Sequence, residues 1–208
     1  SVSNQILQRD RHAHFMSVLA LKATSLDKFA TEVRNLQRTE IGEVEEPFEE
    51  GRHGSSSMPH KRNPSRCERV SGLARVVRNN AGTALENVTL WHERDISHSS
   101  SERIILPDSC IALDYVLWLF NSVIAGLKVN TKRMAANVNS THGLVFSQGV
   151  LLALIEIGMS RQDAYEVVHK HAMKAFNDGV SLERLLSEDS EIMSRLSSAD
   201  LSAIIEPE

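Results

Sequence analysis

The chain has 208 residues, of which 41% are hydrophobic and 24% charged, so it can bury the core of one large domain or two small ones. Its formal net charge of -4, with the nine histidines counted as neutral, gives no overall basic field and argues against nucleic-acid binding. Cys67 and Cys110 match neither a paired metal-ligand spacing nor a disulfide framework, which favours a reducing, cytoplasmic environment.

The beginning of the chain shows no basic stretch followed by an apolar run, so no signal peptide is expected. The first residue is Ser1 rather than methionine, and the chain ends just after a helical pattern. We therefore expect a segment of a longer protein.

Helix is expected to dominate, because aromatic residues make up only 5% of the chain and alternating apolar runs are rare. Apolar residues between positions 15 and 36 recur at spacings of three and four, which predicts a long helix with one buried face. A second helix is predicted from about Pro64 to residue 88, with Asn63 as its cap and Pro64 in its first turn.

The segment from residue 107 to residue 127 is apolar on nearly every side, so we expect it inside a helical bundle. Polar residues interrupt it at Asp108, Asp114 and Asn121, and no membrane span is expected.

After Lys128 the pattern changes to shorter helices separated by turn signals at Gly143, Gly158 and Gly179. We place a domain boundary near residue 129. The predicted domains are a central helical bundle over residues 1–128 and an incomplete C-terminal helical domain over residues 129–208.

Two local patterns refine this second domain. Ser160 and Asp163 resemble a capping box for a helix that runs through Phe176. A further helical stripe runs from Leu182 to Leu196.

A long segment, residues 40–63, separates the first two predicted helices and contains three consecutive serines and the basic run His60-Lys61-Arg62. A loop of this length in a compact helical domain is usually functional or disordered. Composition alone leaves a flexible polar linker as an open alternative.

The end of this segment reads Gly54-Ser55-Ser56-Ser57-Met58-Pro59-His60-Lys61-Arg62-Asn63-Pro64. The string resembles the signature of the fumarase, aspartase and argininosuccinate lyase superfamily, whose members cleave C–N or C–O bonds and release fumarate. A match over consecutive positions is far more specific than a short glycine-spaced motif. The resemblance implies an all-α fold, with a long central helical bundle and a small C-terminal helical domain.

Elimination from a succinyl group needs a base for the proton beside a carboxylate and a cation for the charge that then develops. By the resemblance, Ser55 is the base, while Lys61 and Asn63 hold the carboxylate. Glu68 matches a family carboxylate that orients Lys61. An ordinary first-turn acid favoured by the helix dipole explains Glu68 equally well.

A second string, residues 90–103, resembles the adenylosuccinate lyase family within this superfamily. Residues matching Arg94, Ser99 and Arg103 bind the nucleotide there, and arginines suit bidentate contacts to phosphate. Taken alone, the segment can also be read as two surface arginines in a charged turn. Gln5 falls where the family has a substrate-contacting glutamine.

The resemblance thus implies the catalytic residues Ser55, Lys61 and Glu68. The implied substrate contacts are Gln5, Ser56, Met58, Lys61, Asn63, Arg94, Ser99 and Arg103. No metal and no organic cofactor is implied, and the spacing of His92, Glu93 and His98 does not fit a zinc-protease motif.

The implied reaction is elimination of fumarate from adenylosuccinate, giving AMP, and from SAICAR, the succinylated carboxamide ribotide of purine synthesis, giving AICAR. The family implies a cytoplasmic homotetramer whose sites combine three subunits and which acts on small molecules, without nucleic-acid or membrane partners. Relatives are roughly twice as long, and their general acid, a histidine, lies in the half that this chain does not match. The chain alone is therefore expected to be inactive.

Two alternatives remain open at this point. One is a sibling enzyme such as a carboxymuconate cycloisomerase, which should lack the pattern of residues 91–103. The other is a non-catalytic fragment that still assembles into oligomers.

Overall fold

The structure is a computed structural model that describes residues 5–48, 58, 61–92 and 94–205. The chain divides into two compact units, Ser1–Asn130 and Thr131–Glu208, each with its own hydrophobic core. Over the described ranges, helices account for nearly all of the regular secondary structure, and the strands form one short pair. This confirms the expected all-α fold.

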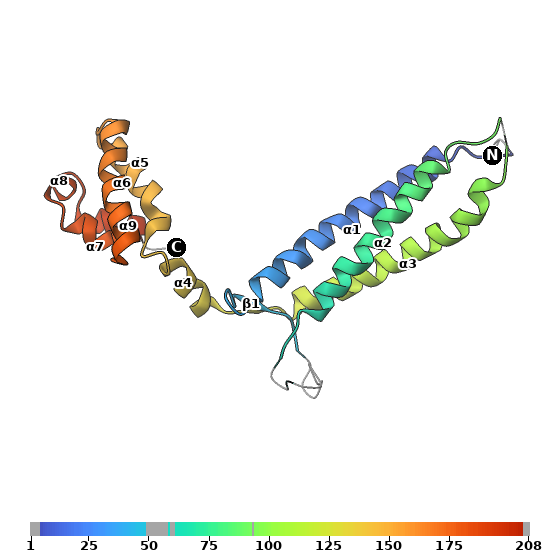
Figure 1. The fold of residues 1–208 in the computed structure, drawn as a ribbon, viewed down its shortest axis with the longest axis horizontal. Helices are drawn as coiled ribbons and strands as arrows, with labels where there is room; N and C mark the ends of the chain where they lie inside the picture. The colour runs from blue at the N-terminus through green and yellow to red at the C-terminus, as the bar shows by residue number, and fades with distance from the viewer. Residues whose placement is uncertain (1–4, 49–57, 59–60, 93, 206–208) are drawn as a thin grey trace. The chain divides into compact units, whose positions relative to one another are not determined.

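Three long helices lie side by side in the first unit: α1 (Asp10–Leu36), α2 (Ser65–Glu86) and α3 (Ser97–Ala125). Helices α1 and α3 run in one direction and α2 runs in the other (Figure 1). Their core is rich in alanine, so the helices can approach one another closely. The buried residues of this core are Ala13, Met16, Leu19, Ala23, Ala74, Val77, Ala81, Ala84, Ile105 and Leu113.

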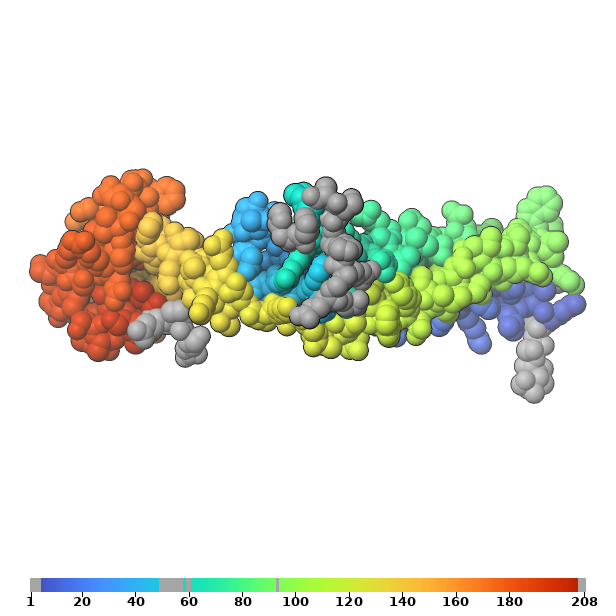
Figure 2. Space-filling model, turned by 90° about the horizontal axis from the view of Figure 1, so that it is seen from below, coloured from blue at the N-terminus to red at the C-terminus, as the bar shows by residue number. Residues whose placement is uncertain are grey.

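Helix α3 is buried on one face only, although its sequence predicted burial on nearly every side. Its inner face carries the buried residues Leu113, Val116, Leu119 and Val123. Its outer face, part of which is visible in green to yellow in Figure 2, exposes the large apolar side chains Ile104, Ile111, Leu117, Trp118 and Ile124. By length and composition alone α3 could span a membrane, but helices in the cores of soluble proteins pass the same test.

The start of α2 also differs from its prediction. Pro64 occupies the N-cap position instead of the first turn, and it supplies no side-chain hydrogen bond. The prediction that Asn63 caps this helix is wrong, because the carboxylate of Glu46 accepts the N–H groups of Arg66 and Cys67 in the first turn.

A short antiparallel pair closes the end of the first unit at which α1 and α3 finish. Strand β1 (Val44–Glu45) pairs with β2 (Lys128–Val129), with Val44 opposite Val129 and Glu45 opposite Lys128. The backbone N–H of Asn130 also donates to the carbonyl of Glu43. The pair therefore ties the chain that follows α1 to the chain that follows α3.

The second unit is a cluster of shorter helices around a leucine-rich core. The left-handed backbone at Gly143, Gly158 and Gly179, with φ of 85°, 95° and 64°, confirms the three turn signals. Its elements are α4 (Thr131–Asn139), η1 (Leu144–Phe146), α5 (Ser147–Glu156), α6 (Arg161–Asp178), α7 (Leu182–Ser187), α8 (Ser190–Met193) and α9 (Ser198–Ile205).

The capping box at the start of α6 is confirmed: the Ser160 hydroxyl accepts the N–H of Asp163 at 3.1 Å. The stripe from Leu182 to Leu196 does not form one helix. It breaks between α7 and α8, where the carboxylate of Asp189 accepts the N–H groups of Glu191 and Ile192 and starts a new helix.

Candidate functional site

The backbone of residues 61–63 is held from two sides at the end of the first unit that carries β1. The Arg62 guanidinium donates to the Glu45 carboxylate at 2.7 Å and lies over the Phe48 ring, 5.2 Å from its centroid. The Gln37 side chain donates its amide N–H to the Arg62 carbonyl at 3.3 Å and accepts the backbone N–H of Glu46 at 3.0 Å. These contacts fix the chain at Arg62, the residue that follows Lys61.

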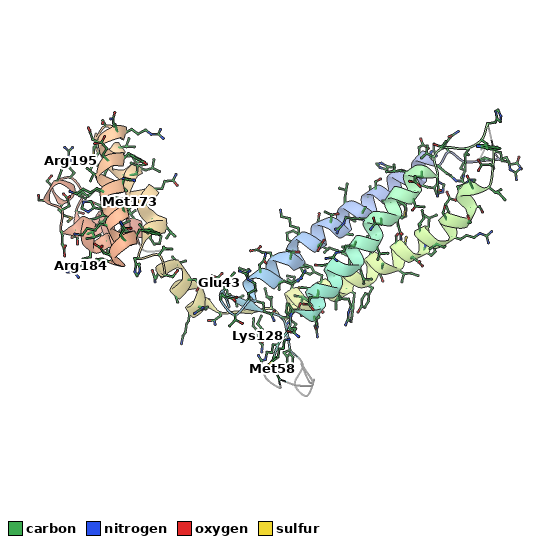
Figure 3. The ribbon with its side chains drawn as sticks, in the orientation of Figure 1. Glu43, Met58, Lys128, Met173, Arg184 and Arg195 are labelled. Carbon is green, nitrogen blue, oxygen red and sulfur yellow. The ribbon has the colours of Figure 1, made fainter. Side chains whose placement is uncertain are left out.

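Three of the predicted substrate contacts line one pocket at this end. Met58, Lys61 and Asn63 border a cavity of about 500 Å³, a size suited to a small ligand. Figure 3 shows Met58 at the same end of the first unit as Glu43 and Lys128, beside the strand pair. The remaining lining residues are Gln37, Thr39, Gly42, Val44, Glu45 and Arg62.

The predicted base Ser55 and the predicted contact Ser56 lie outside the described residues. Glu68 is exposed in the first turn of α2, and no hydrogen bond or ion pair joins it to Lys61. Its role in orienting Lys61 stays a prediction.

Glu46 is the acidic residue at this end that the sequence analysis missed. Its side chain is 5% exposed, and its carboxylate accepts the N–H of Cys67 at 2.6 Å and that of Arg66 at 3.1 Å. Burial, with the nearby Glu46 carboxylate, raises the pKa of the Cys67 thiol far above its usual value, so Cys67 stays protonated and unreactive. A nonlocal cap of this kind leaves no signal in the sequence next to α2.

The opposite end of the first unit is organised by Asp95. The Asp95 carboxylate accepts the Ser97 hydroxyl at 2.6 Å, the Ser97 N–H at 2.9 Å and the Trp91 N–H at 2.7 Å. These hydrogen bonds, led by that of the Ser97 hydroxyl, lower the pKa of Asp95 to about 2. Within this turn His92 has a φ of 51°, a left-handed conformation that costs free energy for a residue other than glycine.

The turn brings together two further predicted substrate contacts. Gln5 and Arg94 both line a cavity of about 840 Å³, to which His92 also contributes. The remaining lining residues are Ile6, Leu7, Gln8, Val88, Thr89 and Leu90. An arginine and an amide at one cavity can together bind an anionic, hydrogen-bonding ligand.

Ser99 and Arg103 lie on the first two turns of α3, close in sequence to this turn. Ser99 is half-buried, and its N–H donates to the carbonyl of Ile96. Neither residue lines the cavity that holds Gln5 and Arg94. The start of α3, which carries Ser99 and Arg103, nevertheless lies at the same end of the helical bundle as the N-terminus of the chain (Figure 1).

The predicted site residues that the structure describes therefore fall into two groups at opposite ends of one unit. Helix α2, with 22 residues, separates Lys61 and Asn63 from Arg94. At 1.5 Å per residue this helix is about 33 Å long, more than a nucleotide can bridge. One unit alone does not bring the two groups together.

Across the described ranges, no group of three or more His, Cys, Asp or Glu side chains is arranged to hold a metal ion.

Two family models match the chain. A family described as lyase matches residues 1–79, and a family described as adenylosuccinate lyase C-terminus matches residues 143–208.

Curated relatives match almost the whole chain. It is 51% identical over 205 residues to an adenylosuccinate lyase of Aquifex aeolicus and 52% identical over 206 residues to one of Staphylococcus saprophyticus. Each alignment covers 99% of this chain, but only 47% and 48% of the respective relative. The chain thus spans about half the length of the curated relatives it matches.

Solved structures share the fold. A 3-carboxy-cis,cis-muconate lactonizing enzyme from Pseudomonas putida has a TM-score of 0.87 and 33% identity, and a fumarate lyase from Mesorhizobium has a TM-score of 0.84 and 28% identity. Each comparison covers 96% of this chain and 44% of the other. The arrangement of helices is therefore that of the fumarate lyase superfamily.

Proposed function

We propose that this chain, which belongs by sequence to the adenylosuccinate lyase family and by fold to the fumarate lyase superfamily, supplies part of the active site of an enzyme that eliminates fumarate from succinylated purine nucleotides. Its substrates are adenylosuccinate, which yields AMP, and SAICAR, which yields AICAR. The observation that carries the proposal is the identity of about half of all positions to adenylosuccinate lyases over 99% of the chain.

The end of the first unit that carries Lys61 and Asn63 provides the chemistry of elimination. Ser55 removes the proton beside the succinyl carboxylate, and the ammonium of Lys61 with the amide of Asn63 stabilises the negative charge that develops. The pocket shared by Met58, Lys61 and Asn63 supports this assignment, because it puts a cation and a hydrogen-bond donor at one cavity. Glu68 orients the Lys61 ammonium as the substrate arrives.

The opposite end binds the nucleotide. Arg94 and Arg103 hold the phosphate through their planar guanidinium groups, while Gln5 and Ser99 supply neutral hydrogen bonds. The cavity shared by Gln5 and Arg94 supports these roles, because a guanidinium and a neutral amide both line it. The turn fixed by Asp95 holds the backbone of Arg94 in place before the substrate binds.

A complete site combines several copies of the protein, as a homotetramer. The length of α2 supports this proposal, because it keeps the elimination group and the nucleotide group apart within one copy. The exposed apolar face of α3 supports the same proposal, because Ile104, Ile111 and Trp118 recur every seven residues, as the seam of a helical bundle requires.

The group that protonates the leaving nitrogen lies in the part of the relatives that this chain does not span. None of its nine histidines matches the family's general acid. The active polypeptide is about the length of the curated relatives, works in the cytoplasm, and uses no metal or organic cofactor. The 208-residue chain alone should turn over adenylosuccinate negligibly, and efficient turnover by it would show that the acid lies within this sequence.

A sibling activity is the nearest rival, since a muconate lactonizing enzyme shares the fold at 33% identity. The higher identity to adenylosuccinate lyases and the string of residues 90–103, which carries Arg94, Ser99 and Arg103, favour a nucleotide substrate.

The test is fumarate release from adenylosuccinate by the polypeptide of full family length, with the Ser55→Ala variant alongside. Turnover that disappears in the variant supports both the family activity and the base. No turnover by the unchanged protein would favour a sibling activity, and full turnover by Ser55→Ala would remove Ser55 from its role.

A further inference from the structure

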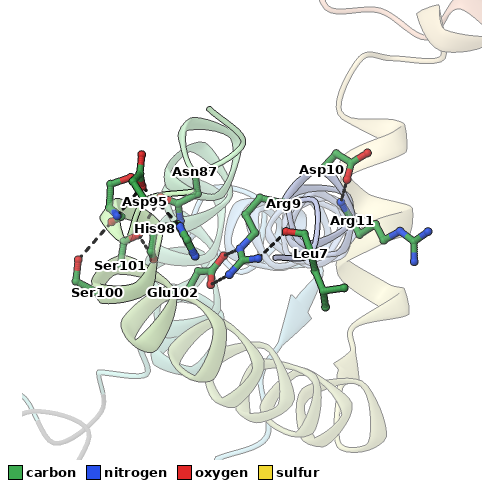
Figure 4. Close-up of polar contacts among 11 residues, drawn as sticks. Leu7, Arg9, Asp10, Arg11, Asn87, Asp95, His98, Ser100, Ser101 and Glu102 are labelled. Carbon is green, nitrogen blue, oxygen red and sulfur yellow. Dashed lines mark hydrogen bonds and ion pairs between the residues drawn. The ribbon is translucent and has the colours of Figure 1, made fainter. Parts of the chain in front are cut away.

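The side chain of Arg9 joins two separate segments of the chain at the end that holds Gln5 and Arg94 (Figure 4). Its Nε donates to Glu102 Oε1 at 2.8 Å, and its Nη2 donates to Glu102 Oε2 at 3.4 Å. Its Nη1 donates to the backbone carbonyl of Leu7 at 2.6 Å. One guanidinium thus connects α3 to the segment that precedes α1.

This ion pair is shielded from solvent. The Arg9 and Glu102 side chains are 14% and 16% exposed, whereas those of the pair Arg184 and Glu188 in the second unit are 71% and 59% exposed. Exposed pairs contribute little, because water and salt screen them and their side chains remain free to move. A shielded, two-pronged contact holds its partners in one orientation.

The two groups that Arg9 joins, the Leu7 carbonyl and the Glu102 carboxylate, lie beside predicted substrate contacts without being such contacts themselves. Leu7 lines the same cavity as Gln5, which comes two residues earlier. Glu102 directly precedes Arg103 on α3 and comes three residues after Ser99. Movement of either partner would displace the residues beside it.

We propose that Arg9 and Glu102 are positioning residues for substrate binding. The pair holds the segment Gln5–Gln8 against α3, so that Gln5 and Arg103 are presented to the nucleotide in a fixed relationship. This inference rests on the proposed function, because it takes the ligand to be the succinylated nucleotide.

The experiment measures steady-state kinetics with adenylosuccinate, using the full-length polypeptide and the variants Glu102→Gln, Arg9→Gln and both together. Each single variant should raise KM about tenfold and change kcat less than about twofold, because ground-state positioning is lost and the reacting groups are untouched. The double variant should be about as impaired as either single one, because both remove the same interaction. The double variant leaves no unpaired charge, so it can still be measured if a single variant fails to fold.

The matched control is Asp27→Asn, which breaks the Arg78–Asp27 ion pair between α2 and α1. That pair joins Nη1 to Oδ2 at 3.0 Å in the middle of the same bundle, and neither residue lines the cavity of Gln5 and Arg94. Asp27→Asn should lower the melting temperature and leave KM unchanged. An equal rise in KM in this control would overturn the inference, since general loosening of the bundle would then explain the effect.

The outcomes separate this inference from the proposed function. An active wild type with an unchanged KM in Glu102→Gln overturns the inference alone. A wild type without turnover overturns the proposed function. Amide hydrogen exchange then tests whether the Arg9–Glu102 ion pair holds the segment before α1 in place. Exchange at Ala13, whose N–H donates to the Arg9 carbonyl at 2.9 Å, should rise at least about tenfold in Glu102→Gln and stay unchanged in Asp27→Asn; unchanged exchange in Glu102→Gln overturns the inference.

Discussion

The Oε1 atom of Glu46 accepts the backbone N–H of Cys67 at 2.6 Å. A carboxylate that precedes the three consecutive serines in the chain therefore caps α2, the helix that follows them. The contact lies at the positive end of the helix dipole, where a carboxylate stabilises the helix most. The same buried carboxylate helps to suppress ionisation of the Cys67 thiol.

Glu46→Ala should lower the free energy of unfolding by about 2 kcal/mol, because the buried N–H groups of Arg66 and Cys67 lose their acceptor. Glu46→Gln keeps one amide oxygen as an acceptor and should cost roughly half as much. Urea unfolding followed by circular dichroism measures both values. Equal stability of the alanine variant and the wild type would mean that the cap contributes nothing.

The two cysteines should differ strongly in reactivity. Cys67 is fully buried with a raised pKa, while Cys110 is exposed on α3. Under native conditions iodoacetamide should modify Cys110 first and leave Cys67 largely unmodified, as peptide mass spectrometry can establish. Glu46→Ala should speed the modification of Cys67. Protection of Cys110 would instead indicate that the outer face of α3 is covered in solution.

Gly126→Ala should destabilise the first unit, because a Cβ at this position would lie 2.7 Å from the Cβ of Pro47, in a rigid ring. The expected loss is about 1–3 kcal/mol.

Gly72→Ala is the matched control, since a Cβ at that position in α2 has open space around it. It should stabilise the helix by about 0.5–1 kcal/mol, because alanine loses less backbone entropy on folding than glycine. Thermal unfolding of both variants measures whether each substitution raises or lowers the stability of the protein. Stabilisation by both variants would show that the packing of Pro47 against Gly126 is unimportant.

The stability of the second unit should depend on pH through Asp189. The pKa of Asp189 lies below its usual value of 3.8, first because of the 2.8 Å hydrogen bond to His171 Nε2, and also because of the N–H groups of Ile192 and Glu191. A carboxyl with a lowered folded pKa stabilises the fold above its unfolded pKa and loses that contribution as pH falls through the folded value. The contribution should therefore be complete above pH about 5 and should decline below pH about 4.

The measurement is urea unfolding of the wild type and Asp189→Asn at several pH values. The advantage of the wild type should shrink as pH falls below about 4. An advantage that grows on acidification would contradict the assigned direction of the pKa shift.

Local patterns predicted much of the fold. Apolar spacings identified the long helices, although α1 begins at Asp10, five residues before the first apolar position used to predict it. Ser160 and Asp163 predicted the start of α6 because a capping box is formed by residues three positions apart.

Contacts between distant positions explain what the sequence analysis missed. Glu46 caps α2 from about 20 positions upstream, and nothing next to Pro64 in the sequence points to it. The break between α7 and α8 depends on Asp189, whose carboxylate also contacts His171 on another helix. The Glu46 cap arises only when distant segments pack together, whereas the Asp189 cap is made to N–H groups two and three residues away and was overlooked in the sequence.

The candidate site was recovered unevenly for the same reason. The motifs point to Lys61, Asn63 and Arg94 as site residues, which stay predictions, and their placement at opposite ends depends on the antiparallel course of α1, α2 and α3. The ion pair between Arg9 and Glu102 joins residues 93 positions apart, so no short sequence motif can predict it.

The distance between the two ends of the bundle has a further consequence for engineering. Substitutions more than about 10 Å apart that share no partners usually have additive effects on folding free energy. Changes around Lys61 can therefore be combined with changes around Arg94, and the stability of the product can be estimated by adding the separate effects. The folding stability of the unit can accordingly be adjusted at each end separately, whereas effects on substrate binding are not expected to add, because the proposed complete site combines both ends.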